Sequence, residues 1–196
     1  PDDQALAAAE GNAELWNALR KRQGEFVNQL QPLLQDPVRM VRMAAASRLI
    51  EIAGQLERPS FQNALDAAVA EYKAGQEMHL DRAGAHVQLA QLSVALGDWP
   101  AAITSMRNAI RQEPYLSGLR GELARLLEQQ ARIEKRSADE NVAAEVRQLR
   151  EKEAELLLRD QKLLPNDPGP HYRRGMLLYL LGEGNAARKE LLESCK

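Results

Sequence analysis

The sequence has few of the residues that build β-sheets and disulfide frameworks. Aromatic residues make up 4% of the 196 residues, threonine is nearly absent, and valine and isoleucine are sparse. The chain has one cysteine, Cys195, so it cannot form an internal disulfide. Alanine, leucine, glutamate, glutamine and arginine dominate, and these residues lose little conformational freedom in a helix. The composition therefore predicts an all-α fold with essentially no β-sheet.

Two further absences exclude classes of function. No apolar run approaches the roughly 18 residues of a membrane span. A net charge of −2 and a pI near 6.0 argue against nucleic acid as the main partner, because phosphate binding requires a basic surface. The first residues also lack a secretory signal. Because the chain starts at Pro1 and stops in an apparently unfinished pattern, we expect it to be part of a longer protein, and the missing signal then says nothing about the compartment.

A helix–turn–helix pattern of 34 residues runs through the middle of the chain. With Ala83 as position 1, small residues fall at positions 8, 20 and 27, glycine falls at the turn, and proline falls near the end (Ala90, Ala102, Ala109, Gly97 and Pro114). Small side chains let two helices approach closely, and proline stops the second helix. This is the tetratricopeptide (TPR) pattern, which predicts a right-handed α-α superhelix, or solenoid.

One repeat cannot bury its own faces, so neighbouring repeats are required. We predict a half repeat at 59–82, a repeat at 83–116, a repeat with an insertion at 117–167 and a last repeat at 168–196. In the last repeat Arg174 occupies position 7, where an apolar residue is usual, so we expect this repeat either to pack imperfectly or to be completed by residues beyond Lys196.

The insertion in the third of these units, residues 131–147, is highly charged. We expect it to extend both helices of its repeat beyond the body of the solenoid. If it is a docking arm, deletion of residues 133–145 would abolish partner binding and leave the melting temperature nearly unchanged. A large drop in melting temperature would instead show that the insertion is structural.

Residues 1–55 follow a different pattern, that of a HEAT repeat. Asp36 is suited to cap a helix and Pro37 to occupy its first position. The helix that follows carries apolar residues and Arg42 at helical spacing, and Trp16 is expected in the core of the preceding helices.

The order of these segments resembles the C-terminal HEAT and TPR region of bacterial multihaem c-type cytochromes. The resemblance rests on "LLQDPVRMVRMAAASRL", Glu71-Tyr72, "MHLDRAGAH" and "GDWPAAITSMRNAI". It covers residues 28–130 well and 165–194 loosely. It implies a periplasmic parent protein that transfers electrons, with haem c bound upstream, because the present chain has no Cys-x-x-Cys-His motif and should hold no cofactor.

The inner helices of TPR repeats line a concave groove, which is the candidate partner-binding site. The positions that usually face it are occupied here by Val87, Gln91, Val94, Gly121, Arg125, Glu128, Gln129, Tyr172, Met176 and Tyr179. Tyr172 and Tyr179 either face the groove or pack against a following helix. Val87 and Gln91 stand where chaperone-binding TPR domains carry lysine and asparagine, so capture of an acidic C-terminal peptide in that manner is not expected.

No residue pattern indicates catalysis or metal binding. His86 and His171 both fall at position 4 of their repeats, where a packing role is the better interpretation, and His79 is expected at an exposed helix end. The sequence shows neither zinc-ligand spacing nor a nucleophile elbow nor a glycine-rich phosphate loop. We therefore expect no catalytic, metal or cofactor-binding residue and no small-molecule substrate.

Three functions fit the sequence. The leading one is a non-enzymatic protein-interaction module of a larger multihaem cytochrome, which docks a redox partner or a subunit. The second is an intramolecular scaffold that packs against the parent's own haem domain. The third is a cytoplasmic TPR adaptor unrelated to electron transfer.

Overall fold

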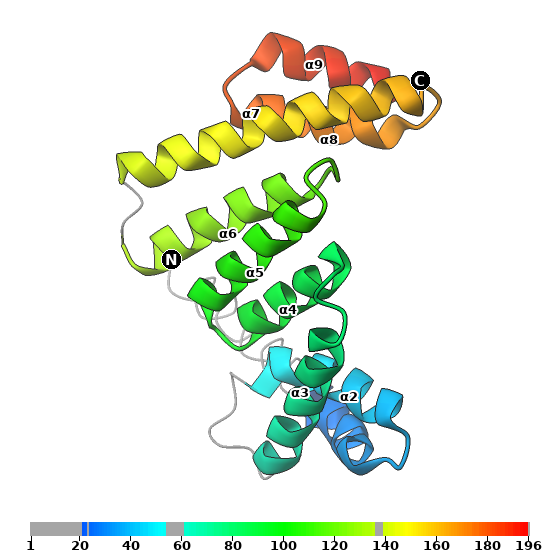
Figure 1. Cartoon of the computed structure of the whole chain (residues 1–196). Coiled ribbons are helices and arrows are strands. Elements are labelled where there is room, and N and C mark those ends of the chain that lie inside the picture. Colours follow the sequence, from blue (N-terminus) through cyan, green and yellow to red (C-terminus); the bar gives the residue numbers. More distant parts are fainter. Residues whose placement is uncertain (1–20, 23, 54–60, 136–138, 196) are drawn as a thin grey trace, which may run out of the picture. The chain divides into compact units, whose positions relative to one another are not determined.

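The computed structural model describes residues 21–22, 24–53, 61–135 and 139–195. Across these ranges the regular elements are all helices and no strand occurs, which confirms the all-α class (Figure 1). The chain divides into two compact units, Pro1–Gly75 and Gln76–Lys196. Trp16 lies outside the described residues, and the repeat boundaries drawn from the sequence stay predictions.

The first unit contains the 3-10 helix η1 (Gln31–Gln35), α2 (Arg39–Ala53) and most of α3 (Gln62–Glu77). Helix α2 begins two residues after Pro37, whereas the sequence predicted Pro37 as its first residue. The reason is a local turn: Asp36 Oδ1 accepts a hydrogen bond from the Val38 backbone N–H at 2.8 Å. From α2, four apolar residues enter the core: Ala45, Ala46, Leu49 and Ile50.

In the second unit each helix packs against the next one along the chain (Figure 1). The helices are α4 (Ala83–Ala95), α5 (Trp99–Gln112), α6 (Leu119–Ile133), α7 (Glu140–Leu163), α8 (Pro168–Leu180) and α9 (Gly184–Glu193).

The turns between these helices follow from short-range chemistry. Gly97 and Gly182 adopt φ angles of 76° and 84°, a left-handed conformation that favours glycine. Asp98 Oδ1 then accepts a hydrogen bond from the Ala101 N–H at 3.0 Å and so caps α5. Asp167 caps α8 in the same way, through the Gly169 N–H at 2.8 Å.

The small residues of the TPR pattern lie where the helices meet. Ala90, Ala102 and Ala109 are 0–1% exposed, and Met106 is 1% exposed between them. Trp99 is partly buried and packs against the same core. Alanine at these positions allows the close approach of helices that the spacing predicted.

The charged insertion is joined to this core. Helix α7 has 24 residues and starts within the insertion, where Asp139 caps it through the Asn141 N–H at 2.9 Å. Val146 is 4% exposed in the core, and Val142 packs against it. Deletion of residues 133–145 would remove part of this packing, so we expect it to lower stability, which argues against the free docking arm.

The packing at Arg174 is not loose, in contrast to the imperfect packing that was one expectation for this position. Its guanidinium forms an ion pair with Glu190 of α9, and its Nε donates a hydrogen bond to the Ala154 carbonyl at 3.3 Å. An ion pair thus takes the place of the usual apolar contact.

Gly175, at position 8 of the predicted last repeat, lies at a close approach of α8 to α9. A Cβ atom at this residue would lie 2.8 Å from Leu191 Cγ and 3.2 Å from the Leu191 backbone nitrogen. We expect Gly175→Ala to lower the free energy of unfolding by about 1–3 kcal/mol, because the helices would have to separate. Urea denaturation measures the effect, and Gly184→Ala is the matched control, since a Cβ there meets nothing within 4 Å. Equal stability of the two variants would contradict the prediction.

Candidate functional site

Three of the predicted groove residues line one small hollow between α4, α5 and α6. Gln91, Val94 and Arg125 surround a volume of about 110 Å³. Arg125 is held in place by Glu122 on the same helix, whose carboxylate accepts hydrogen bonds from its Nε at 3.0 Å and from its Nη2. This hydrogen bonding raises the pKa of the Arg125 guanidinium. The rim of the hollow therefore carries an ion pair, formed by Arg125 and Glu122.

A larger hollow of about 470 Å³ lies on the other side of α6, between α6, α7 and α8. Glu128 is the predicted groove residue that lines it, and its carboxylate accepts a hydrogen bond from Arg150 Nη2 at 2.7 Å. The other lining residues are mostly apolar or basic: Ala131, Arg132, Val142, Ala143, Val146, Arg150 and Leu180.

The predicted residues of α8 form an exposed apolar face. Tyr172, Met176 and Tyr179 are 55%, 42% and 68% exposed, and their spacing places them on one side of the helix. Leu180 is 53% exposed and joins this face to the larger hollow. Contiguous large apolar side chains left in solvent are typical of interaction sites.

The remaining predicted residues do not line either hollow. Val87 is partly buried against the core of the second unit. Gly121 faces α7, because a Cβ atom there would lie 3.7 Å from Glu153 Cγ. Gln129 is half-buried on α6. The structure thus brings together parts of the predicted groove and turns Val87 and Gly121 inward.

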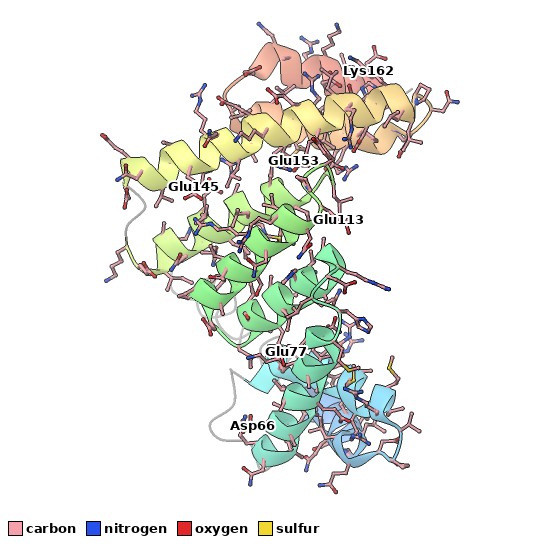
Figure 2. All side chains as sticks on the ribbon, viewed as in Figure 1. Asp66, Glu77, Glu113, Glu145, Glu153 and Lys162 are labelled. Carbon is pink, nitrogen blue, oxygen red and sulfur yellow. The ribbon has the colours of Figure 1, made fainter. Side chains whose placement is uncertain are left out.

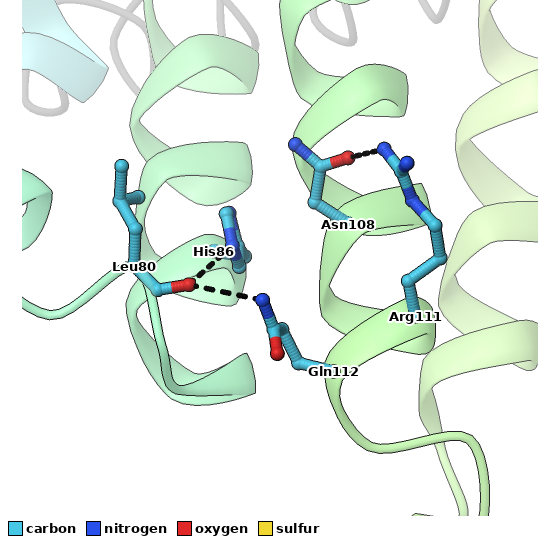
Figure 3. A pocket seen from close by; sticks show the side chains of 5 residues that line it. All are labelled: Leu80, His86, Asn108, Arg111 and Gln112. Carbon is cyan, nitrogen blue, oxygen red and sulfur yellow. Dashed lines mark hydrogen bonds between the residues drawn. The ribbon is translucent and has the colours of Figure 1, made fainter.

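A third hollow, of about 380 Å³, lies beside the turn before α4 (Figure 3). His86 is 6% exposed, and its Nε2 lies 3.0 Å from the Leu80 carbonyl oxygen, which also accepts a hydrogen bond from Gln112 Nε2 at 3.3 Å. Asn108 and Arg111 hydrogen-bond each other at its edge (Figure 3). His86 therefore ties the turn to α4, in agreement with the predicted packing role, and His79 is exposed as expected.

Two carboxylates connect neighbouring helices within their units, and neither was predicted to have a structural role. Glu153 of α7 accepts hydrogen bonds from the backbone N–H groups of Gly118 and Arg120 at the start of α6, and Figure 2 shows it on the side of α7 that faces α6. In the first unit, Glu71 accepts hydrogen bonds from Arg42 Nε at 2.9 Å and Nη2 at 2.6 Å. This bidentate pairing lowers the pKa of Glu71 and raises that of Arg42. Glu71 belongs to the "EY" pair on which the family resemblance rests, whereas Glu153 belongs to no pattern described in the sequence.

Within the described ranges, no group of three or more histidine, cysteine, aspartate or glutamate side chains is placed to hold a metal ion. The same ranges hold no helix that is both long enough and apolar enough to cross a membrane. No protein-family model matches the chain, and no curated protein sequence matches it. The resemblance to multihaem cytochromes therefore stays a prediction from the sequence.

Proposed function

We propose that the chain is a non-enzymatic protein-interaction module whose helix pairs α4–α9 are TPR-type repeats in a right-handed superhelix. The observation that carries the proposal is the exposed apolar face of α8, where Tyr172, Met176 and Tyr179 occupy three positions that face the groove in TPR repeats. The hollow lined by Gln91, Val94 and Arg125 supports it, since these are groove positions of the two preceding inner helices.

We further propose that the module belongs to a larger multihaem cytochrome, exported to the periplasm, and that it docks a redox partner or a subunit there. The support for this part is the sequence resemblance described above. The chain itself supplies no haem-attachment motif, so the haem c would be bound by a preceding domain of the parent.

A site-specific crosslinking experiment tests the proposed function. A photoreactive amino acid replaces Met176 on the exposed face of α8, and the purified chain is irradiated in periplasmic and cytoplasmic extracts of the source cell separately. The control places the same group at Arg188, an exposed residue of α9 that belongs to no groove position. We expect a discrete adduct with a redox protein from the periplasmic extract at position 176 and none at position 188.

A charge reversal in the groove gives a second test of the same proposal. Arg125→Glu is expected to abolish the crosslink, whereas Arg188→Glu is expected to leave it unchanged. Absence of any adduct, or equal adducts at 176 and 188, would contradict the proposed function. An adduct formed only with the parent's separately expressed haem domain would favour the scaffold, and one formed only in the cytoplasmic extract would favour the adaptor.

A further inference from the structure

The larger hollow exists because neighbouring helices differ in length. Helix α7 has 24 residues and α8 has 13, so α7 is 11 residues longer. At 1.5 Å per residue, about 16 Å of α7 has no counterpart in α8. Figure 1 shows the first turns of α7 continuing past the end at which the chain turns from α8 into α9. Among the residues that the structure describes, no helical segment takes the place of α8 beside this part of α7.

The floor of this opening is apolar. Ala131 and Val146 are 3% and 4% exposed, and Val142 and Ala143 continue the surface along α7. Leu180, 53% exposed, closes the end next to α8. The volume of about 470 Å³ lies within the range of pockets that bury a ligand group. An apolar side chain is the group that such a floor stabilises, because its burial removes apolar area from water on both sides.

Two arginines, Arg132 and Arg150, and one carboxylate, Glu128, line the opening. Arg150 pairs with Glu128 at 2.7 Å, so these two charges compensate each other. Arg132 is exposed on the same rim, and none of the carboxylates in the described ranges forms an ion pair with it. A carboxylate on the occupant would complete this rim, because charged interface groups are arranged to meet opposite charges.

The opening continues into the exposed face of α8 through Leu180. From Tyr172 to Leu180 this face spans nine residues, whose eight steps of 1.5 Å correspond to about 12 Å of helix. A small amphipathic acid would fill the hollow and leave this face in water. A helix with an apolar stripe covers both, which is the usual arrangement of helix-in-groove recognition.

We propose that this notch, defined by Ala143, Val146, Arg132 and Leu180, binds an amphipathic helix of a partner protein. An apolar side chain of the partner enters the hollow, and an aspartate or glutamate near it on the partner helix pairs with Arg132. This inference rests on the proposed interaction function and names the chemistry of the partner at one part of its surface.

Selection from a helical peptide library tests the inference on the full chain. The library consists of alanine-based helices of about 18 residues, long enough to hold a helix in water, with the positions of one face randomised. We expect the enriched peptides to carry leucine or phenylalanine next to aspartate or glutamate. Fluorescence anisotropy then measures their affinity for the parent chain and its variants.

Ala143→Trp fills the hollow with a side chain from an exposed position and is expected to weaken these peptides at least about tenfold. Ala144→Trp is the matched control, because Ala144 is also exposed on α7 and does not line the hollow. Arg132→Glu is expected to weaken the acidic peptides and to improve binding of versions in which lysine replaces the acid. A melting curve for each variant shows that its fold is retained.

Several outcomes would overturn the inference. One is the absence of any enriched peptide. Another is that the enriched peptides bind the Ala143→Trp variant with the same affinity as the unsubstituted chain. The last is that lysine-bearing peptides bind the unsubstituted chain most tightly. Dimerisation that Ala143→Trp abolishes, measured by sedimentation, would assign the notch to a second copy of the chain instead. If the crosslink at position 176 forms and is insensitive to Ala143→Trp, the proposed function stands and the notch inference fails; if no crosslink forms at all, the proposed function fails.

Discussion

Replacement of Glu190 by alanine is expected to lower the free energy of unfolding of the second unit by about 3 kcal/mol, because it leaves partly buried charged and polar groups without a partner. Glu190 lies on α9 with 12% of its side chain exposed. Its carboxylate meets three groups from two other helices: Gln161 Nε2 of α7 at 2.8 Å, and His171 Nδ1 at 2.8 Å and the Arg174 guanidinium, both of α8. Loss of one carboxylate therefore removes three contacts at once.

The contrast between removal of one partner and removal of both makes this prediction specific. Arg174→Leu alone restores the apolar residue that TPR repeats usually have at position 7, but it leaves the buried Glu190 carboxylate without its main counter-charge. The double variant Arg174→Leu/Glu190→Leu replaces the ion pair by apolar groups, a change that often costs little. We expect it to be more stable than the summed effects of Arg174→Leu and Glu190→Leu predict, by about 1–3 kcal/mol.

Trp99 provides a probe of the second unit for this experiment. In a Trp16→Phe background the fluorescence of Trp99, which packs against the core of the second unit, is followed through urea denaturation. Lys189→Ala is the control, since Lys189 is an exposed neighbour on α9. A Glu190→Ala variant as stable as Lys189→Ala would show that the network contributes nothing to the fold.

The parts of the fold that the sequence predicted are those that depend on neighbours along the chain. Ala90, Ala102 and Ala109 fall at positions 8, 20 and 27 of one 34-residue sequence pattern, so this pattern alone predicted their burial. Asp98 and Gly97 act on groups within a few residues of themselves. Composition and short-range spacing are sufficient for elements of this kind, because helix and turn formation is mostly decided locally.

The parts that the sequence did not predict depend on residues far apart along the chain. Arg174 was recognised as anomalous at position 7, but its partner Glu190 lies 16 residues away and is one of many glutamates on helix surfaces. Gly121 matched a groove position by count, and it turns inward because α7 passes close to it. Periodicity predicts the side of a helix on which a residue lies, but it does not predict which neighbouring helix packs against that side.

The candidate site shows the same division. Tyr172, Met176 and Tyr179 were predicted from their positions in the repeat, and all three are exposed on one face of α8. Arg132, Ala143 and Leu180 were not predicted as site residues. The notch that they line arises where α7 extends beyond the end of α8. The extra length was visible in the sequence as the charged insertion at 131–147, but the opening depends on where α7 and α8 begin and end.

The second large effect is expected at Glu153, a buried carboxylate that caps a helix from another helix. Helix α6 has Gly118 as its N-cap residue, with a φ angle of 101° and no side-chain hydrogen bond of its own. The Glu153 carboxylate of α7, 2% exposed, accepts the Gly118 N–H and also the Arg120 N–H at 3.2 Å. Its negative charge also lies at the positive end of the α6 dipole.

Glu153→Gln is expected to lower the free energy of unfolding of the second unit by about 2 kcal/mol. The amide keeps the shape of the side chain, but an NH₂ group replaces one of the two carboxylate oxygens. This group is a donor, so it leaves one of the two backbone N–H groups without an acceptor. Charge stabilisation of the α6 dipole is lost in the same step. Glu153→Ala is expected to cost about 3 kcal/mol, because it leaves both N–H groups unpaired and opens a cavity.

Amide hydrogen exchange gives this prediction a readout that general destabilisation does not. Exchange at residues 118–122 should accelerate in Glu153→Gln under conditions where the amides of α9 keep their protection, since the lost acceptor serves only the first turn of α6. Glu155→Gln removes a charge from the same helix at an exposed position and should change neither quantity. Uniform acceleration across the second unit would mean that Glu153 matters for packing alone. Acceleration confined to the start of α6 would mean that the N-terminus of α6 depends on a residue 35 positions later, and that α7 fixes where α6 begins.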